Sequence, residues 1–389
     1  WMQVTLLGWL VLELTDSPLL VSLVGFFLFL PLLLFGLIGG FLTDQIDKRK
    51  LIIMSNLISL VAASLMMIQL IAGVEKFWHA YVTILFVGIG WSFEMPSRRA
   101  FVHDLLGSEG VVNGLALDSM AISTSFILGP SLGGVLITIA GVAGGYLAVV
   151  VFYAIAVVLA FNIASMSPVN RMAGGHGFVN VLNTFVEGCQ YVWGKQALLG
   201  VVLVTILMNL LMFPYLNMVP VIARDVLGVG PGLMGTMQAS MGCGAVFGAM
   251  GIAFLTNIRY HSRFYLFGAV IAFASLILFS FSRVYVLSIL SLFVLGVGMA
   301  GSSTMQATIV VLVAKQDMRG KALGILSIAI GVAPFGALII GSVADFAGPS
   351  IAVRLNATLG IILLMGVVFF MPSLLGTVIS DESIEANRY

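Results

Sequence analysis

The sequence predicts an all-α membrane protein in which about twelve transmembrane helices form two pseudo-symmetric bundles of six. Mean hydropathy is +1.15, and 8 % of the 389 residues are charged, whereas soluble domains have about 25 %. The apolar runs are about 20 residues long, the length of a membrane-spanning helix. The strands of a β-barrel would instead alternate apolar and polar residues over about 10 positions.

The predicted spans are bounded by charges, proline or glycine. The first is too short to cross a bilayer, so we expect that the start of this helix and any preceding tail are missing from a sequence that begins at Trp1. The spans cover residues 1–15, 18–41, 51–73, 77–96, 112–138, 142–164, 197–222, 231–256, 263–281, 285–313, 320–344 and 350–372.

The longest interruption separates an N-terminal bundle, residues 1–165, from a C-terminal bundle with a short cytoplasmic tail, residues 197–389. Residues 166–177 are rich in Pro, Gly, Ser and Asn, which is typical of a linker. Residues 178–193 alternate apolar and polar side chains at helical spacing, which predicts a helix at the membrane interface. We therefore expect residues 166–196 to form a cytoplasmic linker with an interfacial helix.

Basic residues orient the chain, because cytoplasmic loops of membrane proteins are enriched in Lys and Arg. With the charged loop Gly40–Lys50 in the cytoplasm, thirteen of the 17 bases fall on that side and both termini are cytoplasmic. The four bases on the outer side are Lys76, Arg224, Arg283 and Arg354.

The two halves share short motifs at a nearly constant offset. Gly114-Leu115-Ala116-Leu117 corresponds to Gly320-Lys321-Ala322-Leu323, and Gly88-Ile89-Gly90 corresponds to Gly296-Val297-Gly298. Matches in the same order and at one offset favour duplication. Many transporters consist of such repeats, with the substrate site between them near the middle of the membrane.

Several motifs make the chain similar to the major facilitator superfamily. The loop after the second span resembles that family's Gly-x-Leu-x-Asp-x-x-Gly-Arg-Lys-Arg signature through Gly40, Leu42, Asp44, Lys48 and Arg49, although Asp47 replaces its second Gly. The fifth span resembles the antiporter signature through Gly129, Pro130, Gly133 and Gly134. The Arg that is usual in the family's fourth span is absent from residues 84–90.

Three further segments resemble the branch that contains the enterobactin exporter and macrolide efflux proteins. They are residues 8–18, residues 96–100 with Glu109 and Asn113, and residues 220–228. The resemblance implies the major facilitator fold, two six-helix bundles around a central cavity, and a function in export. For the fifth span it implies a helix bend that seals against ion leak; plain helix packing is the alternative.

The resemblance also implies a conformational latch in the loop after the second span. In this interpretation Asp44 accepts hydrogen bonds from Arg98 or Arg99 of the next cytoplasmic loop, and Lys48 and Arg49 belong to the same cluster. The alternative is that Asp44 is a solvated loop acid that only helps to set the topology.

Three acids lie within spans or at their ends. A buried carboxylate tends to take up a proton, which a proton-coupled carrier requires. Asp118 lies more than a turn into the fifth span and is the first candidate for coupling or substrate contact, with an ion pair to Arg98 or Arg99 as the alternative. Glu13 is a weaker candidate, and Glu94 is expected to form a structural ion pair with the nearby arginines.

Uncharged polar side chains in the second half are candidates for lining the cavity: Asn209, Asn217, Gln238 and Gln306. The alternative, which is the more common role of such residues, is that each forms a hydrogen bond between helices. Five apolar side chains near them would suit a large apolar ligand, because Met side chains repack easily: Met208, Met212, Phe213, Met237 and Met241.

Other functional classes lack their motifs. Residues 188–195 have the wrong spacing for a phosphate loop, and the four His residues are separated in the sequence, so we expect no enzyme, cofactor or metal site. Cys189 and Cys243 are far apart and fit small buried thiols better than a disulfide. The bases form no patch with interleaved aromatic residues, which argues against nucleic acid as a partner.

The sequence thus predicts a secondary active transporter of the inner membrane. It is expected to act as a monomer, with protons and a small-molecule substrate as partners in the lipid bilayer. The resemblance implies export, and the expected substrate is a small amphipathic or hydrophobic compound exchanged for protons, with the proton gradient as energy source. The alternatives are export of a specific siderophore-like metabolite and a receptor or scaffold that transports nothing.

Overall fold

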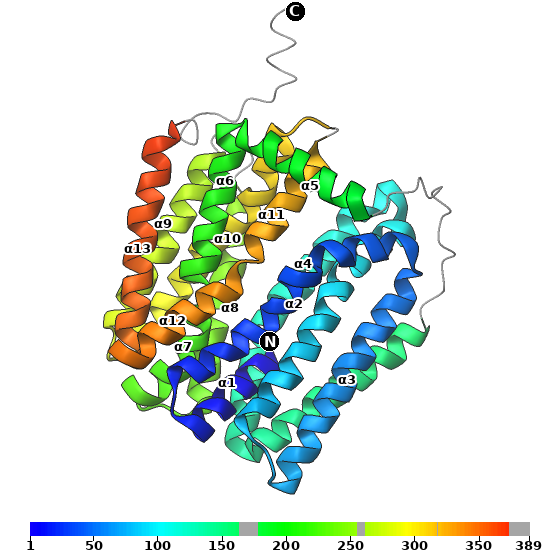
Figure 1. Cartoon of the computed structure of the whole chain (residues 1–389). Coiled ribbons are helices and arrows are strands. Elements are labelled where there is room, and N and C mark those ends of the chain that lie inside the picture. The colour runs from blue at the N-terminus through cyan, green and yellow to red at the C-terminus, as the bar shows by residue number, and fades with distance from the viewer. Residues whose placement is uncertain (163–177, 255–260, 317, 373–389) are drawn as a thin grey trace, which may run out of the picture. The chain divides into compact units, whose positions relative to one another are not determined.

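The computed structural model describes residues 1–162, 178–254, 261–316 and 318–372; for residues 36–45, 103, 108, 109, 112 and 178–185 it describes the backbone alone. Every regular element in these ranges is a helix, which confirms the all-α prediction (Figure 1). The helices are α1 (Met2–Thr15), α2 (Pro18–Gln45), α3 (Lys48–Ala72), α4 (Phe77–Asn162), α5 (Phe178–Trp193), α6 (Gln196–Leu207), η1 (Met208–Met212), α7 (Tyr215–Val221), η2 (Ile222–Val226), α8 (Pro231–Ala253), α9 (His261–Phe281), α10 (Tyr285–Val313), α11 (Arg319–Ile330), α12 (Ala333–Ala347) and α13 (Pro349–Phe370).

The long element α4 contains three spans. Its backbone leaves the helical conformation at Gly107 and Gly141, where φ is 63° and 69°. A residue with a side chain pays roughly 1–2 kcal/mol for this left-handed conformation, so glycine suits both reversals. With α4 counted as three spans, α6 to η2 as one and α11 with α12 as one, the described helices supply the twelve predicted spans. Eight of the described helical segments are by themselves long and apolar enough to cross a membrane.

Spans seven and eleven are not the uninterrupted helices that the sequence predicted. Span seven contains two π-helical turns, in which the Phe213 N–H donates to the Met208 carbonyl at 2.9 Å and the Leu227 N–H donates to the Ile222 carbonyl at 3.0 Å. It also extends to Val226, beyond the predicted end at residue 222. Span eleven is interrupted between α11 and α12, next to Pro334. Proline has no N–H to donate, so a helix that contains it loses one backbone bond.

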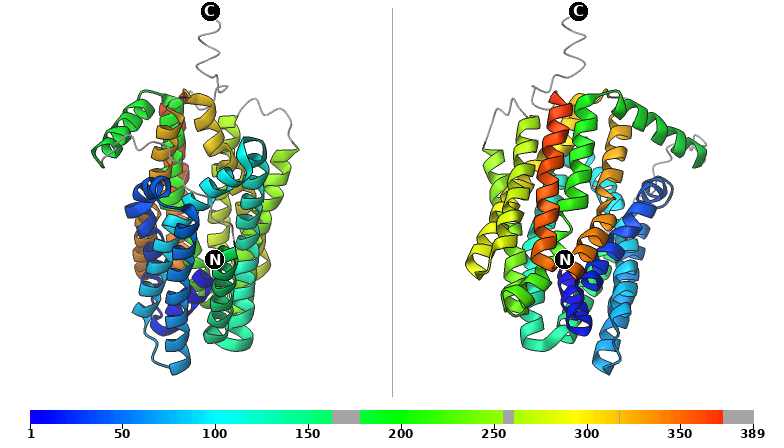
Figure 2. Two further views of the ribbon diagram at one scale, coloured as in Figure 1. Left: turned by 90° about the vertical axis from the view of Figure 1, so that its right-hand side faces the viewer. Right: turned by 60° about the vertical axis from the view of Figure 1, so that its left-hand side comes forward.

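The contacts between residues group the chain into two compact units. Unit 1 comprises Trp1–Asn170, Leu216–Ala239 and Ala337–Ser350, and unit 2 comprises Arg171–Tyr215, Ser240–Gly336 and Ile351–Tyr389. In unit 1, helices α1, α2 and α3 pack against α4, and α3 stays beside α4 in the views of Figure 2. In unit 2, α9 packs along α10, and α6 contacts α10 and α11. The predicted division of the chain into an N-terminal bundle that ends at residue 165 and a C-terminal bundle that begins at residue 197 stays a prediction.

Helix α5 has the predicted bounds of residues 178–193. Glu187 Oε2 forms an ion pair with Lys321 Nζ of α11 at 2.5 Å, and the Tyr191 hydroxyl accepts the backbone N–H of Lys315 at 2.9 Å. These contacts hold the second half of α5 against the start of α11. The interfacial position of α5 stays a prediction.

Candidate functional site

An acid–base cluster lies in the first two spans of α4. Glu94 and Arg98 are four residues apart and therefore share a helix face. Asp118 lies eleven residues after the reversal at Gly107 and Arg98 nine residues before it, so the reversal brings the two to a similar level. Arg98 Nε lies 3.2 Å from Asp118 Oδ1 and 3.5 Å from Glu94 Oε1. The structure thus brings together one base and two of the three predicted acids.

The cluster holds two carboxylates for one guanidinium. The Asp118 side chain is 8 % exposed, that of Glu94 25 % and that of Arg98 33 %. Arg98 Nε is buried and has no hydrogen-bond partner in the described part of the chain, so charge and not a directed hydrogen bond holds it to the carboxylates. If both acids are ionised, the cluster carries one net negative charge, which is costly in a membrane. One proton bound to either carboxylate neutralises it.

The residues predicted to form the latch have separate partners where their side chains are described. Lys48 Nζ forms an ion pair with Asp104. The Arg49 guanidinium donates to the carbonyl oxygens of Ala160 at 3.4 Å and Phe161 at 2.5 Å, at the end of α4. Arg99 is exposed. Asp44 lies in the last turns of α2, but its side chain is outside the described residues, so the latch stays a prediction.

The glycines of the antiporter-like run lie where α4 meets α1 and α8. A Cβ added at Gly129 would lie 2.9 Å from the Met2 nitrogen of α1. A Cβ at Gly134 would overlap the Pro231 carbonyl oxygen of α8, and one at Gly235 would overlap the Pro130 carbonyl oxygen. The backbone keeps helical dihedral angles here, since α4 departs from them at Gly107 and Gly141. The run therefore permits two close helix approaches, and its role as a sealing bend stays a prediction.

Arg224 of η2 links two segments that are distant in the sequence. Its guanidinium lies 2.7 Å from Asp16 Oδ1, donates to the Leu12 carbonyl oxygen at 3.1 Å and lies 2.6 Å from Asp225 Oδ1. It thus adds a second donor to the Leu12 carbonyl, which also accepts the Asp16 N–H at 3.0 Å, near the C-terminus of α1, where a positive charge is favourable. A second contact nearby joins the Ser17 hydroxyl, as donor, to Asp345 Oδ1 at 3.0 Å. We call Asp16–Arg224 and Ser17–Asp345 the outer contacts, after the side of the membrane on which the basic residues predict them; all four residues belong to unit 1.

Sequence reasoning missed the Asp16–Arg224 pair. Both residues lie in segments that resemble the exporter branch, residues 8–18 and 220–228, and their charges are opposite. Arg224 was also one of only four bases predicted on the outer side. Opposite charges on the sparsely charged side of a membrane protein were the signal that could have suggested the pair.

Replacing Asp16 by Asn is expected to loosen the end of α1. Exposed ion pairs contribute about 0–1 kcal/mol, so the buried residue Val11 should become up to about fivefold more accessible. The measurement is the labelling rate of Val11→Cys by a membrane-impermeant maleimide, with Cys189 and Cys243 replaced by Ser. Asp225→Asn is the control, because Asp225 also pairs with Arg224 but lies on η2 itself. Equal labelling in the Asp16 and Asp225 variants would contradict the assignment.

The uncharged candidates already have protein partners. Asn209 donates to the Thr205 carbonyl at 2.9 Å, Gln306 donates to Thr205 Oγ1 at 2.8 Å, and Thr5 Oγ1 lies 2.7 Å from Gln238 Oε1. Asn217 packs against Gly25, and the exposed Glu13 accepts the Trp9 indole N–H at 2.6 Å. Their roles as ligand contacts stay predictions. Of the side chains predicted to suit an apolar ligand, Phe213 is half-buried and the four methionines are buried: Met208, Met212, Met237 and Met241. Their role in binding a ligand stays a prediction.

A buried polar network in unit 1 was not expected from the sequence. Gln3 donates to the Tyr146 hydroxyl at 3.3 Å, and the Tyr153 hydroxyl donates to Gln3 Oε1 at 3.4 Å.

No group of three or more His, Cys, Asp or Glu that could hold a metal ion occurs among the described residues. Cys189 and Cys243 are free and half-buried, and partial burial raises the pKa of the Cys189 thiol.

Comparison with known proteins places these features in a family. The family described as transmembrane secretion effector matches residues 1–389. The multidrug efflux pump Tap of Mycolicibacterium fortuitum is 26 % identical over 380 residues, which cover 94 % of this chain and 90 % of that protein. The staphyloferrin A transporter of Staphylococcus aureus is 21 % identical over 361 residues, covering 90 % of this chain and 86 % of its own.

Solved structures show the same fold. The nucleoside transporter NupG superposes with a TM-score of 0.72 at 13 % identity, over 94 % of this chain and 96 % of that chain. Three observations indicate the same kind of protein: the twelve spans, the family match over the whole chain and the efflux pump among its relatives. The chain is a multi-pass membrane transporter of the major facilitator superfamily and belongs to its family of transmembrane secretion effectors.

Proposed function

We propose that the chain exports a small amphipathic or hydrophobic compound in exchange for protons. The observation that carries this proposal is Asp118, whose side chain is 8 % exposed and which shares Arg98 with Glu94 where the first two spans of α4 approach their connection at Gly107. Because the three groups carry one excess negative charge when both acids are ionised, the cluster has room for one proton. A substrate that displaces this proton would couple its own export to proton entry.

Export by alternating access requires contacts that hold one side of the membrane closed and that break when it opens. The outer contacts and the close approach of Gly134 to Gly235 are suited to this role, because each joins a helix of residues 1–165 to a helix of residues 197–389. In the orientation that the basic residues favour, Asp16 and Arg224 face the outside and both termini face the cytoplasm. We place the protein in the inner membrane, acting as a monomer.

The apolar compound class is supported by the similarity of the chain to Tap, a multidrug efflux pump. The test is accumulation of ethidium, a fluorescent hydrophobic cation, in cells that express the chain. Expressing cells should accumulate less ethidium than cells with an empty vector, and a protonophore should remove the difference. A difference that survives the protonophore would argue against proton coupling, and no difference with any of several hydrophobic cations would argue against this compound class.

A siderophore-like metabolite is the second candidate, because the staphyloferrin A transporter is a relative. Siderophores with carboxylate groups need cationic partners, whereas two acids flank Arg98. The acid–base cluster therefore favours a neutral or cationic substrate. The test is protection of the purified protein against thermal unfolding. Protection by a carboxylate siderophore, but not by hydrophobic cations, would make the siderophore-like metabolite the better candidate.

A further inference from the structure

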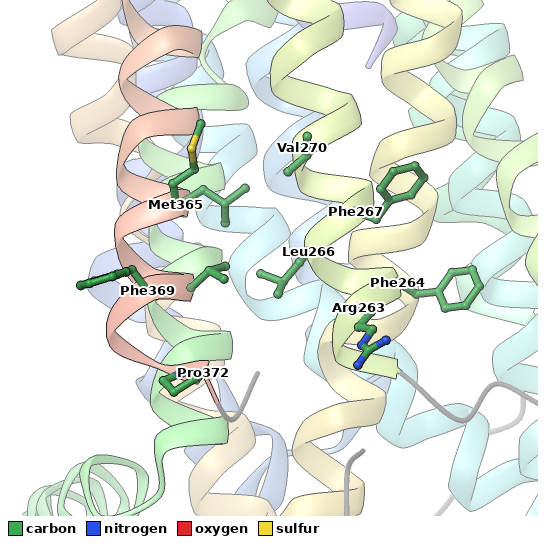
Figure 3. A pocket seen from close by; sticks show the side chains of 10 residues that line it. Arg263, Phe264, Leu266, Phe267, Val270, Met365, Phe369 and Pro372 are labelled. Carbon is green, nitrogen blue, oxygen red and sulfur yellow. The ribbon is translucent and has the colours of Figure 1, made fainter. Parts of the chain in front are cut away.

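We propose that a groove between α9 and α13 in unit 2 binds an anionic phospholipid. The groove has a volume of about 910 Å³. Its described lining consists of one base and nine apolar residues: Arg263, Phe264, Leu266, Phe267, Val270, Leu364, Met365, Val368, Phe369 and Pro372. Figure 3 shows Arg263 and Pro372 toward the same end, with Met365 and Val270 toward the other. An apolar trough with a base at one end matches the two parts of a phospholipid.

Close packing at one end of the helix pair accounts for the groove at the other. A Cβ added at Gly360 of α13 would overlap the Phe273 ring of α9, so the two helices touch there. Beyond this contact, the Arg354 guanidinium lies 3.6 Å from the centre of the Phe281 ring and donates to the Ser280 carbonyl at 3.4 Å. The groove begins on the other side of the Gly360–Phe273 contact, where α9 and α13 leave space between them (Figure 3).

The groove fits within one leaflet. Its lining on α9 runs from Arg263 to Val270, seven residues further along, which corresponds to about 10 Å of helix. The hydrocarbon core of a bilayer is about 30 Å thick, so each leaflet contributes about 15 Å. Arg263 is exposed and lies in the first turn of α9, where the chain enters the membrane. Acyl chains in the groove would therefore place the phosphate of the same lipid at the level of Arg263.

The charge of Arg263 selects the headgroup. A guanidinium matches phosphate geometry and attracts a lipid with net negative charge more strongly than a zwitterionic one. The orientation proposed above puts this end of α9 at the cytoplasmic face; the choice of leaflet rests on that proposal, whereas lipid binding itself does not. The occupant is therefore an anionic phospholipid such as phosphatidylglycerol.

Native mass spectrometry of the purified protein, given equal amounts of phosphatidylglycerol and phosphatidylcholine with the same acyl chains, tests this proposal. The wild type should retain phosphatidylglycerol preferentially. Arg263→Gln should weaken this retention about fivefold, the contribution of one base near an anionic surface, while Arg263→Lys should largely preserve it. Arg283→Gln is the matched control, because Arg283 follows the other end of α9 and should leave retention unchanged.

Filling the groove tests the acyl-chain part without changing any charge. Val270→Trp should lower retention of both lipids, whereas Leu278→Trp, at an exposed position two turns further along α9, should not. This arm keeps the proposal testable if Arg263→Gln does not fold. Equal retention of the two lipids by the wild type, equal losses in the Arg263→Gln and Arg283→Gln variants, or full retention in Val270→Trp would each overturn the proposal. Because lipid retention is measured without transport, failure of the export proposal would leave this result unaffected.

Discussion

Asp118→Asn is expected to reduce substrate-driven proton movement by more than tenfold, a loss of at least about 1.4 kcal/mol of coupling. Asparagine keeps the size of the side chain but cannot ionise, so the proposed proton-binding site is removed. Removing one partner of a buried ion pair often costs about 3–5 kcal/mol of stability. Here Glu94 still lies 3.5 Å from Arg98, which should keep the protein folded. The measurement is substrate-induced release of protons in everted membrane vesicles.

Asp104→Asn is the matched control for Asp118→Asn. Asp104 lies on the same element, α4, and also pairs with a base, but it is exposed and its partner is Lys48. It should keep normal proton release. Normal release in Asp118→Asn with lowered thermal stability would show that the cluster is a structural ion pair only, which is the alternative considered from the sequence.

Gly235→Ala is expected to impair transport strongly although it adds a single methyl group. The new Cβ would overlap the Pro130 carbonyl oxygen and lie 3.1 Å from Gly134 Cα, and these backbone atoms cannot move aside as a side chain could. Overpacking costs about 1–3 kcal/mol. If the α4–α8 approach forms in one transport state, that cost lowers the population of the state about 5- to 150-fold. The measurement is the initial rate of ethidium efflux at matched protein level.

Gly251→Ala provides the control on the same helix. A Cβ at Gly251 meets no atom within 4 Å, so this variant should transport at the wild-type rate. If both glycine variants transport normally, the close approach of α4 to α8 is not needed for the transport cycle. If both fail equally, the loss comes from helix α8 in general and not from this contact.

Local patterns in the sequence were enough to predict most helices. The bounds of α5 agree with the polar and apolar spacing of residues 178–193, because helical periodicity is recorded in neighbouring residues. The reversals at Gly107 and Gly141 fall in the gaps between predicted spans. The π-helical turns of span seven were not predictable in this way. Met208–Met212 includes Asn209 and Ile222–Val226 includes Arg224 and Asp225, but neither stretch has a spacing that distinguishes a π-helical turn from an α-helical one.

The candidate site was only partly predictable. Glu94, Arg98 and Asp118 lie within 24 positions, so one helix reversal is enough to bring them together, and the sequence suggested both ion pairs. Asp16 and Arg224 are far apart in the chain, and no periodicity links them. Their contact depends on the approach of α1 to α7 and η2, where a Cβ added at Gly8 would lie 3.4 Å from Pro220 Cγ. From a single sequence each of the two segments can be recognised, but not the contact between them.

The most direct test of the proposed proton-coupled export is transport in proteoliposomes that contain the purified protein as the only transporter. The interior is buffered more acidic than the outside, and uptake of ethidium through inside-out molecules is followed by fluorescence quenching. Proton antiport predicts accumulation above the outside concentration, collapse on addition of a protonophore, and no accumulation with Asp118→Asn. Uptake that only reaches the outside concentration, with or without the pH difference, would contradict it.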